Sequence, residues 1–187
     1  ARAGLVVHHH LLAQVGRHAL GDPLPQTLEQ HAGAMIFGGP MSANDPDDWI
    51  AREIDWIGVA LKEQKPFLGV CLGAQMLSKH LGGTVGPHAD GLVEIGYYDL
   101  LPTAEGVAHG PWPQKVYHWH REGLTLPSGA IRLATGETFE NQAFRYGERA
   151  FGIQFHPEVT RLTMHRWGVI HRDLKPANVL VVDGQVK

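Results

Sequence analysis

The feature that most restricts the fold of this chain is the segment Gly-Val-Cys-Leu-Gly at residues 69–73. It joins a short apolar run, residues 67–70, which predicts a buried strand, to a helical pattern that continues to about Leu81. Glycines are needed on both sides of Cys71 because a Cβ atom would clash where a strand turns sharply into a helix. This is the pattern of a nucleophile elbow, with cysteine in place of serine. The thiol would lie at a helix N-terminus, where the helix dipole favours the thiolate.

The same five residues would also suit an inert cysteine buried between a strand and a helix. A catalytic cysteine needs a base, and the segment Phe155-His156-Pro157-Glu158 offers one. His156 follows a strand-like segment, residues 151–154, so we expect it at the carboxyl end of a strand, where sites in open α/β sheets lie. Glu158 could hold the imidazole by its other nitrogen, since geometry and not chain order defines a triad. Alone, His156 would be an ordinary polar residue; beside the elbow it becomes the candidate base.

Two backbone N–H groups are candidates for stabilising an oxyanion. The amide of Leu72 begins the predicted helix and points into the same space as the thiol. The segment Gly38-Gly39-Pro40 follows a second apolar run, residues 34–37, and its two glycines could expose a second backbone N–H there. Without the elbow, this second segment would be taken as an ordinary turn from a strand to a loop.

The first half of the chain alternates predicted strands with predicted helices. Residues 4–8 predict a further buried strand, residues 11–20 are weakly helical, and a helix capped by Asn44 or Asp45 is expected to continue to about Gln64. The second half is rich in strand-like segments, at residues 92–101, 115–120, 131–134, 143–146 and 150–155, with a hairpin turn at residues 146–149. The sequence therefore predicts an α/β fold with a parallel central sheet and an additional antiparallel portion.

Composition excludes several classes of protein. A chain of 187 residues suits one domain with a single core. A net charge of −3 is unlike that of a nucleic-acid binder or a membrane-surface protein. No apolar run approaches the roughly 18 residues of a membrane span. The single cysteine allows no internal disulfide and fits a reducing compartment, so we expect a cytoplasmic protein with no nucleic-acid or membrane partner.

Several motifs, in this order, resemble those of one enzyme family. The elbow continues into Ala74-Gln75, it is preceded by residues 38–40, and it is followed by residues 155–158. Together they are similar to class I (triad-type) glutamine amidotransferases. The segments at residues 41–45, 94–96 and 117–120 resemble small stand-alone members, which are similar to the glutaminase domain of GMP synthase. The likeness is clearest over residues 20–167, so we expect one such domain at residues 1–167.

The resemblance implies a fold and a reaction. The fold would be a flavodoxin-like three-layer α/β/α sandwich with a mostly parallel sheet. The reaction would be hydrolysis of the glutamine side-chain amide through a γ-glutamyl thioester on Cys71. His156 would serve as general base and then as general acid, and Glu158 would orient it.

The resemblance also implies roles for three further residues. Gly39 and Leu72 would supply the oxyanion N–H groups, and Gln75 matches the position that helps to hold the glutamine substrate. In such enzymes the ammonia passes to a synthetase domain or a partner synthetase. The resemblance implies no cofactor and no metal ion.

Two parts of the chain depart from this pattern. The family has a strand, a helix and a second strand before a segment like residues 21–25, and the few residues between Val7 and Leu20 barely fit a parallel crossover. One early sheet element is therefore expected to be missing or rebuilt. The tail, residues 168–187, contains a string similar to a protein-kinase catalytic loop, with Asp173 as base and Asn178 as metal ligand. The other parts of a kinase site are absent, so we expect neither kinase activity nor a separate domain there.

Two groups of histidines are candidate metal ligands. The triplet at residues 8–10 is most simply incidental. His118 and His120 alternate on a predicted strand and share one face, but without a third ligand they favour a structural or substrate-pocket role. Two other functions stay open. The same triad could serve a γ-glutamyl hydrolase or peptidase, and the two unusual ends leave open a non-catalytic binding protein.

Overall fold

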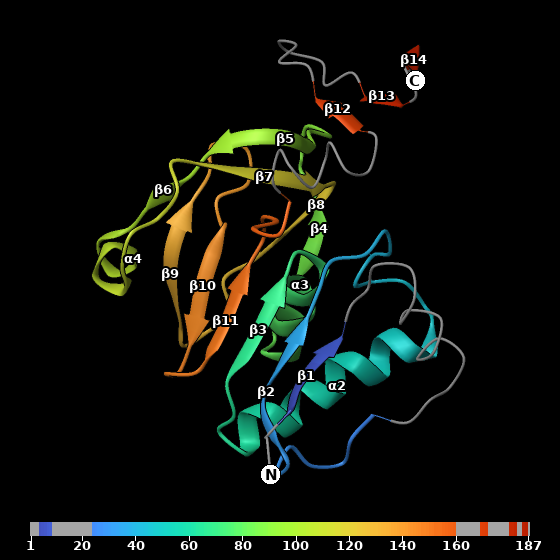
Figure 1. The fold of residues 1–187 in the computed structure, drawn as a ribbon, viewed down its shortest axis with the longest axis vertical. Coiled ribbons are helices and arrows are strands. Elements are labelled where there is room, and N and C mark those ends of the chain that lie inside the picture. Colours follow the sequence, from blue (N-terminus) through green and yellow to red (C-terminus); the bar gives the residue numbers. More distant parts are fainter. Residues whose placement is uncertain (1–3, 9–23, 160–168, 172–179, 183–184, 187) are drawn as a thin grey trace.

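A computed structural model describes residues 4–8, 24–159, 169–171, 180–182 and 185–186 of the chain. Its centre is a seven-stranded sheet (Figure 1). In spatial order the strands are β1 (Gly4–His8), β2 (His31–Ile36), β3 (Phe67–Val70), β11 (Ala150–Ile153), β10 (Ala143–Tyr146), β9 (Ala130–Thr135) and β6 (Leu101–Pro102).

Parallel and antiparallel strands divide this sheet into two parts. The pairs β1–β2, β2–β3 and β3–β11 are parallel, and β11, β10, β9 and β6 are joined by antiparallel pairs. In the β3–β11 pair, Val70 lies opposite Ile153, and the amide of Cys71 donates a hydrogen bond to the Ile153 carbonyl at 2.8 Å. The carboxyl ends of the two strands therefore meet, and the residues that follow each strand are brought to one place.

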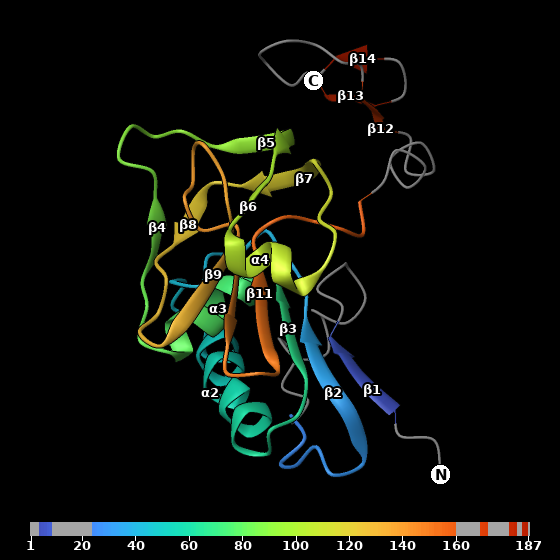
Figure 2. The ribbon, with the colours of Figure 1, turned by 90° about the vertical axis from the view of Figure 1, so that its left-hand side faces the viewer.

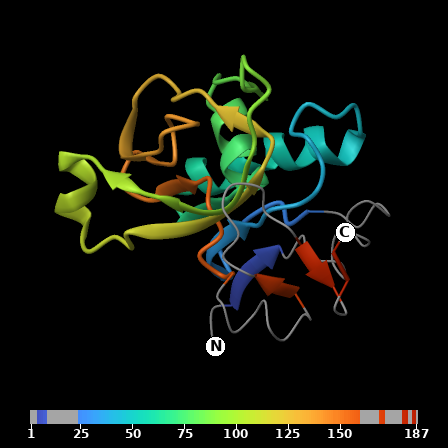
Figure 3. The same ribbon diagram turned by 90° about the horizontal axis from the view of Figure 1, so that it is seen from above.

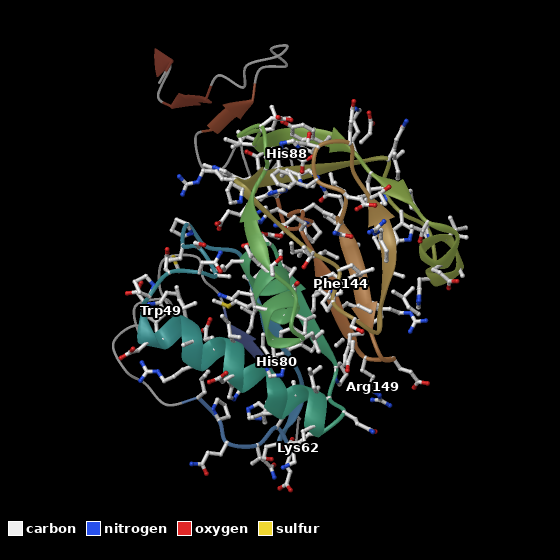
Figure 4. The ribbon with its side chains drawn as sticks, turned by 180° about the vertical axis from the view of Figure 1, so that it is seen from behind. Trp49, Lys62, His80, His88, Phe144 and Arg149 are labelled. Atoms are coloured by element: carbon white, nitrogen blue, oxygen red, sulfur yellow. The ribbon has the colours of Figure 1, made fainter. Side chains whose placement is uncertain are left out.

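Helices α2 (Asp48–Lys62) and α3 (Leu72–His80) lie on the same side of the sheet (Figures 2 and 3). Seen from behind, α2 extends between Trp49 and Lys62, and His80 of α3 lies where the two helices meet (Figure 4). Gly58 permits this contact, because a Cβ atom there would lie 3.0 Å from His80 Cε1. Helix α4 (Ala104–His109) packs apart from them, against β9.

The start of α2 differs from the prediction. The N-cap is Asp47, not Asn44 or Asp45, and its side chain makes no capping hydrogen bond. The two expected caps are used in the preceding loop. Asp45 accepts from the amide of Ser42, and the side chain of Asn44 is held by the Val85 carbonyl and the Lys79 ammonium. Tertiary contacts therefore take the groups that local sequence assigned to the helix.

Short strand pairs lie outside the central sheet. The pairs are β4 (Val85–Pro87) with β8 (Glu122–Leu124), and β5 (Glu94–Asp99) with β7 (Lys115–His120); three further strands, β12 (Val169–His171), β13 (Leu180–Val182) and β14 (Gln185–Val186), form a small sheet of their own. The predicted strand at residues 92–101 is in fact two strands. Its first part pairs with β7, and beyond Leu100 the chain crosses to the central sheet as β6.

The main hydrophobic core lies between the sheet and helices α2 and α3. Burial of large apolar side chains contributes about 1.5–3 kcal/mol each. The fully buried members of this core are Leu28, Ile36, Ile50, Ile57, Phe67, Leu72, Met76, Leu77 and Phe144. A smaller cluster under β9 and β10 contains Leu100, Val116, Leu133 and Phe155. Leu72, which follows β3, belongs to the main core, and Phe155, which follows β11, belongs to the smaller cluster, so each strand end is held by a core of its own.

The predicted fold class is confirmed: the protein is a mixed α/β fold whose central sheet has a parallel part and an antiparallel part. The described residues supply the sheet and one helical layer. The predicted helix at residues 11–20, most of the histidine triplet, and the kinase-like Asp173 and Asn178 lie outside the described residues. Among the described helices, none has the length and apolar character needed to cross a membrane.

Gly73→Ala should destabilise the protein, because the added Cβ would collide with the carbonyl oxygen of Ile36 on β2, which is backbone and cannot rotate away. We expect the free energy of unfolding to fall by about 1–3 kcal/mol or more, measured as the urea midpoint. Gly86→Ala is the matched control, since a Cβ atom there meets nothing within 4 Å. Equal midpoints for the two variants would contradict the packing described at the elbow.

Candidate active site

Cys71 occupies a strained turn between β3 and α3. Its backbone angles are φ 51° and ψ −107°, in a region that residues with a side chain rarely adopt. Conformations of this kind cost about 1–3 kcal/mol and persist only when the surroundings enforce them. The two flanking glycines show how: a Cβ on Gly69 would strike the Gly73 carbonyl, and a Cβ on Gly73 would strike Ile36. The elbow predicted from the sequence is therefore present.

His156 lies beside Cys71, with Gly38 between the two side chains. A Cβ atom on Gly38 would lie 3.1 Å from Cys71 Cβ and 2.7 Å from His156 Cε1. Only glycine lets the loop after β2 approach both residues this closely. The backbone of His156 is fixed separately, because its amide donates to the Tyr117 carbonyl of β7 at 2.8 Å. Sheet pairing thus brings together two residues that are far apart in sequence.

Glu158 holds the imidazole of His156 from the other side. His156 Nδ1 and Glu158 Oε1 are 2.7 Å apart, a short distance typical of a charge-assisted hydrogen bond. With Nδ1 bound to the carboxylate, Nε2 is left facing the interior, where it is buried and makes no hydrogen bond of good geometry within the described part of the chain. Such contacts are often long before substrate binds. The ring is therefore oriented with one nitrogen available.

Charge at the site favours the protonated form of His156. Burial alone would lower the pKa of the imidazole, but interactions with Cys71 and Glu158 outweigh burial and raise this pKa to about 10. The side chain of His156 is only 14% exposed, so solvent screens these interactions weakly. An imidazolium between a thiolate and a carboxylate can deliver a proton to a leaving group and later take one from water.

Gln154, which we did not foresee as a site residue, contacts the nucleophile directly. Its side chain is fully buried, and Nε2 lies 3.9 Å from Cys71 Sγ, within hydrogen-bond reach of sulfur. Gln154 Oε1 lies 3.5 Å from Gln75 Nε2, which also donates to the Glu122 carbonyl at 2.9 Å. One signal could have found it: Gln154 and His156 are two residues apart at the end of a strand, and so share a face.

The two residues that carry the candidate oxyanion amides lie next to each other at the elbow. Leu72 is the first residue of α3, so its N–H has no acceptor within the helix. Gly39 packs against the same residue, since a Cβ atom there would lie 3.3 Å from Leu72 Cδ2. The structure therefore brings the residues singled out from the sequence, Cys71, His156, Glu158, Gly39, Leu72 and Gln75, into one region at the carboxyl edge of the sheet.

The strand that anchors His156 also carries a buried polar cluster. Burial lowers the pKa of His118 to about 4, the nearby His120 and His156 act in the same direction, and Glu94 opposes them. Glu94 keeps a pKa below its usual value, because its contacts with His120, His118 and Gln142 outweigh the cost of burial. His118 and His120 are therefore not isolated polar residues, and His118 interacts electrostatically with the candidate base, His156.

Comparison with known proteins points to one family. Residues 9–170 match the family model described as glutamine amidotransferase class-I. The chain is 30% identical over 150 residues to the glutamine amidotransferase-like protein YfeJ of Salmonella typhimurium, covering 75% of this chain and 62% of that protein. It is 32% identical over 158 residues to a GMP synthase of Aeropyrum pernix, covering 83% of this chain and 29% of that enzyme.

A third relative has a different name. Gamma-glutamyl peptidase 5 of Arabidopsis thaliana is 30% identical over 147 residues, covering 74% of this chain and 58% of that protein. The chain thus spans under two thirds of the length of each of these three relatives. Among solved structures, a glutamine amidotransferase from Thermotoga maritima superposes with a TM-score of 0.74 at 32% identity, covering 89% of this chain and 81% of the other. A glutamine amidotransferase from Methylobacillus flagellatus superposes with a TM-score of 0.73 at 26% identity, covering 88% of this chain and 73% of the other.

His156 should stay protonated until the pH approaches about 10, which NMR titration of histidine ring signals can measure. Since this value lies above that of an unfolded histidine, about 6.5, the proton stabilises the fold fully below about pH 6.5, and this contribution is lost as the pH rises through the folded pKa. Glu158→Gln should lower the pKa of His156, because it removes the negative charge of Glu158, which helps to raise this pKa. A wild-type titration near 6.5 would contradict the charge arrangement described here.

Proposed function

Because the chain belongs to the class-I glutamine amidotransferases, we propose that it hydrolyses the side-chain amide of glutamine through a γ-glutamyl thioester on Cys71. The observation that carries the proposal is the strained elbow at Cys71 facing an imidazole that Glu158 holds at 2.7 Å. A nucleophile, a base and an orienting carboxylate in this relation are the minimum for covalent acyl transfer.

The first half of the reaction forms the thioester. Cys71 Sγ attacks the side-chain carbonyl carbon of glutamine, and the carbonyl oxygen becomes an oxyanion. The amides of Gly39 and Leu72 donate hydrogen bonds to that oxyanion; removal of one such donor typically costs about 10²–10³ in rate. His156 then donates its Nε2 proton to the amide nitrogen. The carbon–nitrogen bond breaks, ammonia leaves, and a thioester remains on Cys71.

The second half releases glutamate. Neutral His156 removes a proton from a water molecule, and the resulting hydroxide attacks the thioester carbon. The second oxyanion collapses, the carbon–sulfur bond breaks, and Cys71 leaves as a thiolate beside a protonated His156. Glu158 stabilises the imidazolium at both stages through the bond to Nδ1.

The buried side-chain amides of Gln154, which follows β11, and Gln75, on α3, would assist this chemistry. Gln154 donates an N–H toward Cys71 Sγ and would stabilise the thiolate before attack and after deacylation. Gln75 is linked to Gln154 and to the Glu122 carbonyl, so it fixes that amide and lies one helical turn from the nucleophile. We assign Gln75 to holding the substrate glutamine, with its side chain positioned by these two contacts.

The ammonia would pass to a synthetase. The GMP synthases among the relatives support this assignment, because this chain matches only 29% of the Aeropyrum pernix enzyme and so corresponds to a part of it. The acceptor activity would then reside in another domain or another chain. A free nucleophilic thiol also needs a reducing environment, which supports a cytoplasmic location.

A second candidate function is γ-glutamyl peptidase activity, which the Arabidopsis relative favours. The thioester half of the mechanism is the same, and only the leaving amine differs. Nothing in the triad itself distinguishes ammonia from an amino acid as the leaving group. The choice depends on whether the space beyond the scissile bond accepts a further residue.

Cys71→Ala should abolish glutaminase activity, and His156→Ala should lower kcat by at least about 10³-fold, because nucleophile and base act as a unit. Release of ammonia and glutamate from glutamine, measured in a coupled assay, would check both. His109→Ala is the control, since His109 is exposed on α4, away from the elbow. A Cys71→Ala protein that still turned over glutamine would overturn the proposal.

The substrate can be tested by comparing kcat/KM for free glutamine with kcat/KM for γ-glutamyl dipeptides. A glutaminase should favour glutamine by about tenfold or more, because an ordered pocket that fits an amide must be disturbed to accept a larger group. A preference for the dipeptides would replace the first proposal with the second. Equal loss of both activities in Cys71→Ala would show that one thioester serves both.

A further inference from the structure

A second group of chemically active side chains lies on the paired strands β5 and β7, outside the proposed reaction. In the antiparallel register, Glu94 lies directly opposite His120, and His118 is two residues before His120 on the same strand face. All three side chains are buried, with exposures of 1% for Glu94, 1% for His118 and 3% for His120. The sequence alone offered only the two histidines; strand pairing supplies a carboxylate as the third group.

The three polar atoms form a small triangle. His118 Nδ1 is 3.0 Å from His120 Nε2, His120 Nε2 is 3.0 Å from Glu94 Oε2, and Glu94 Oε2 is 3.3 Å from His118 Nδ1. Zinc binds imidazole nitrogen and carboxylate oxygen at about 2.0–2.2 Å in tetrahedral geometry, which places neighbouring ligand atoms roughly 3.3–3.5 Å apart. The triangle therefore has nearly the dimensions of one face of a zinc tetrahedron.

Few hydrogens are available to the three polar atoms of this triangle. His120 Nδ1 lies 3.1 Å from the carbonyl oxygen of Glu122, which can only accept, so the hydrogen of a neutral His120 is on Nδ1. His120 Nε2 then presents a lone pair to the carboxylate oxygen of Glu94 at 3.0 Å. Two lone pairs at this distance repel unless a hydrogen or a metal ion lies between them. A neutral His118 can offer one Nδ1–H to His120 Nε2 at 3.0 Å and to Glu94 Oε2 at 3.3 Å, whereas a metal ion would bind all three atoms at once.

The surrounding groups orient these atoms as the outer shell of a metal site does. A histidine that binds a metal usually donates its other N–H to a carbonyl or a carboxylate, and the His120–Glu122 contact has this form. Gln142, itself 1% exposed, donates to Glu94 Oε2 at 2.9 Å and fixes the carboxylate. Aromatic rings close the site: Tyr98 packs edge-on against His118, and Phe139 against His120.

We propose that Glu94, His118 and His120 form a binding site for one divalent transition-metal ion, with zinc as the ion that best suits two imidazoles and one carboxylate. Among the described residues, these three are the group whose ligand atoms all lie within 4.8 Å of one another. The fourth tetrahedral position is left to a water molecule. A bound ion would tie β5 to β7, the strand whose Tyr117 carbonyl anchors His156. The proposal is independent of the glutaminase mechanism.

The test uses the 187-residue chain in which Cys71 is replaced by Ala and His8, His9 and His10 by Asn. These changes remove the elbow thiol and the histidine triplet as competing metal ligands. After treatment with a chelator and addition of zinc, the protein should retain about one zinc ion per chain through gel filtration. Cobalt in place of zinc should give the visible absorption of a tetrahedral site without sulfur. Failure to retain either metal would overturn the proposal and leave only hydrogen bonds within the triangle.

Variants locate the metal. In the same background, His120→Gln should weaken zinc binding by at least about 100-fold, and Gln142→Leu by about 10–100-fold, since outer-shell partners matter to that extent. His109→Gln, on exposed α4, is the matched control and should bind zinc unchanged. Undiminished binding in His120→Gln would overturn the proposal. If His120→Gln does not fold, X-ray absorption of zinc bound to the protein that retains His120 must show two imidazole ligands. Fewer than two imidazole ligands would overturn the proposal.

Discussion

The parallel pairing of β11 with β3 is the interaction on which the candidate site depends. Val70 lies opposite Ile153, and the Cys71 amide donates to the Ile153 carbonyl at 2.8 Å, so the ends of the two strands are in fixed register. A slip of one residue would turn every side chain of β11 to the other face of the sheet. Gln154 and His156 would then no longer face the thiol. The site is thus determined by backbone hydrogen bonds before any catalytic side chain makes a contact.

The strained backbone of Cys71 is a second, local requirement of the site, besides the register of β3 and β11. The turn brings the thiol to the start of α3 only if neighbouring chain segments pass within contact distance, and glycine is the residue that allows this at positions 38, 69 and 73. The close contacts come from three separate segments: the loop after β2, the end of β3 and the start of α3. The core around Leu72 and Met76 then holds α3 in place. Packing therefore supplies the free energy that maintains an unfavourable backbone conformation.

What the sequence could and could not predict follows from the range of the interactions. The elbow and the His156–Glu158 pair are local patterns, and the residues predicted there do lie together. The N-cap of α2 was predicted wrongly because Asn44 and Asp45 are taken by Val85, Lys79 and Ser42. The predicted strand at residues 92–101 was wrong in extent because the chain changes sheets within it. The role of Glu94 depends on the pairing of β5 with β7, and no local pattern carries that information.

The hydrogen bond from the His156 amide to the Tyr117 carbonyl means that nucleophile and base are mounted on different supports. Cys71 is rigidly joined to the central sheet and α3, whereas the backbone of His156 is also fastened to the separate β5–β7 ribbon. The position of His156 relative to Cys71 therefore depends on how the β5–β7 ribbon packs on the central sheet. A displacement of the ribbon would reach the imidazole through this backbone contact and through the ring of His118, which packs against Phe155. Trp119 of β7 is 55% exposed, so one face of the β5–β7 ribbon is open to solvent.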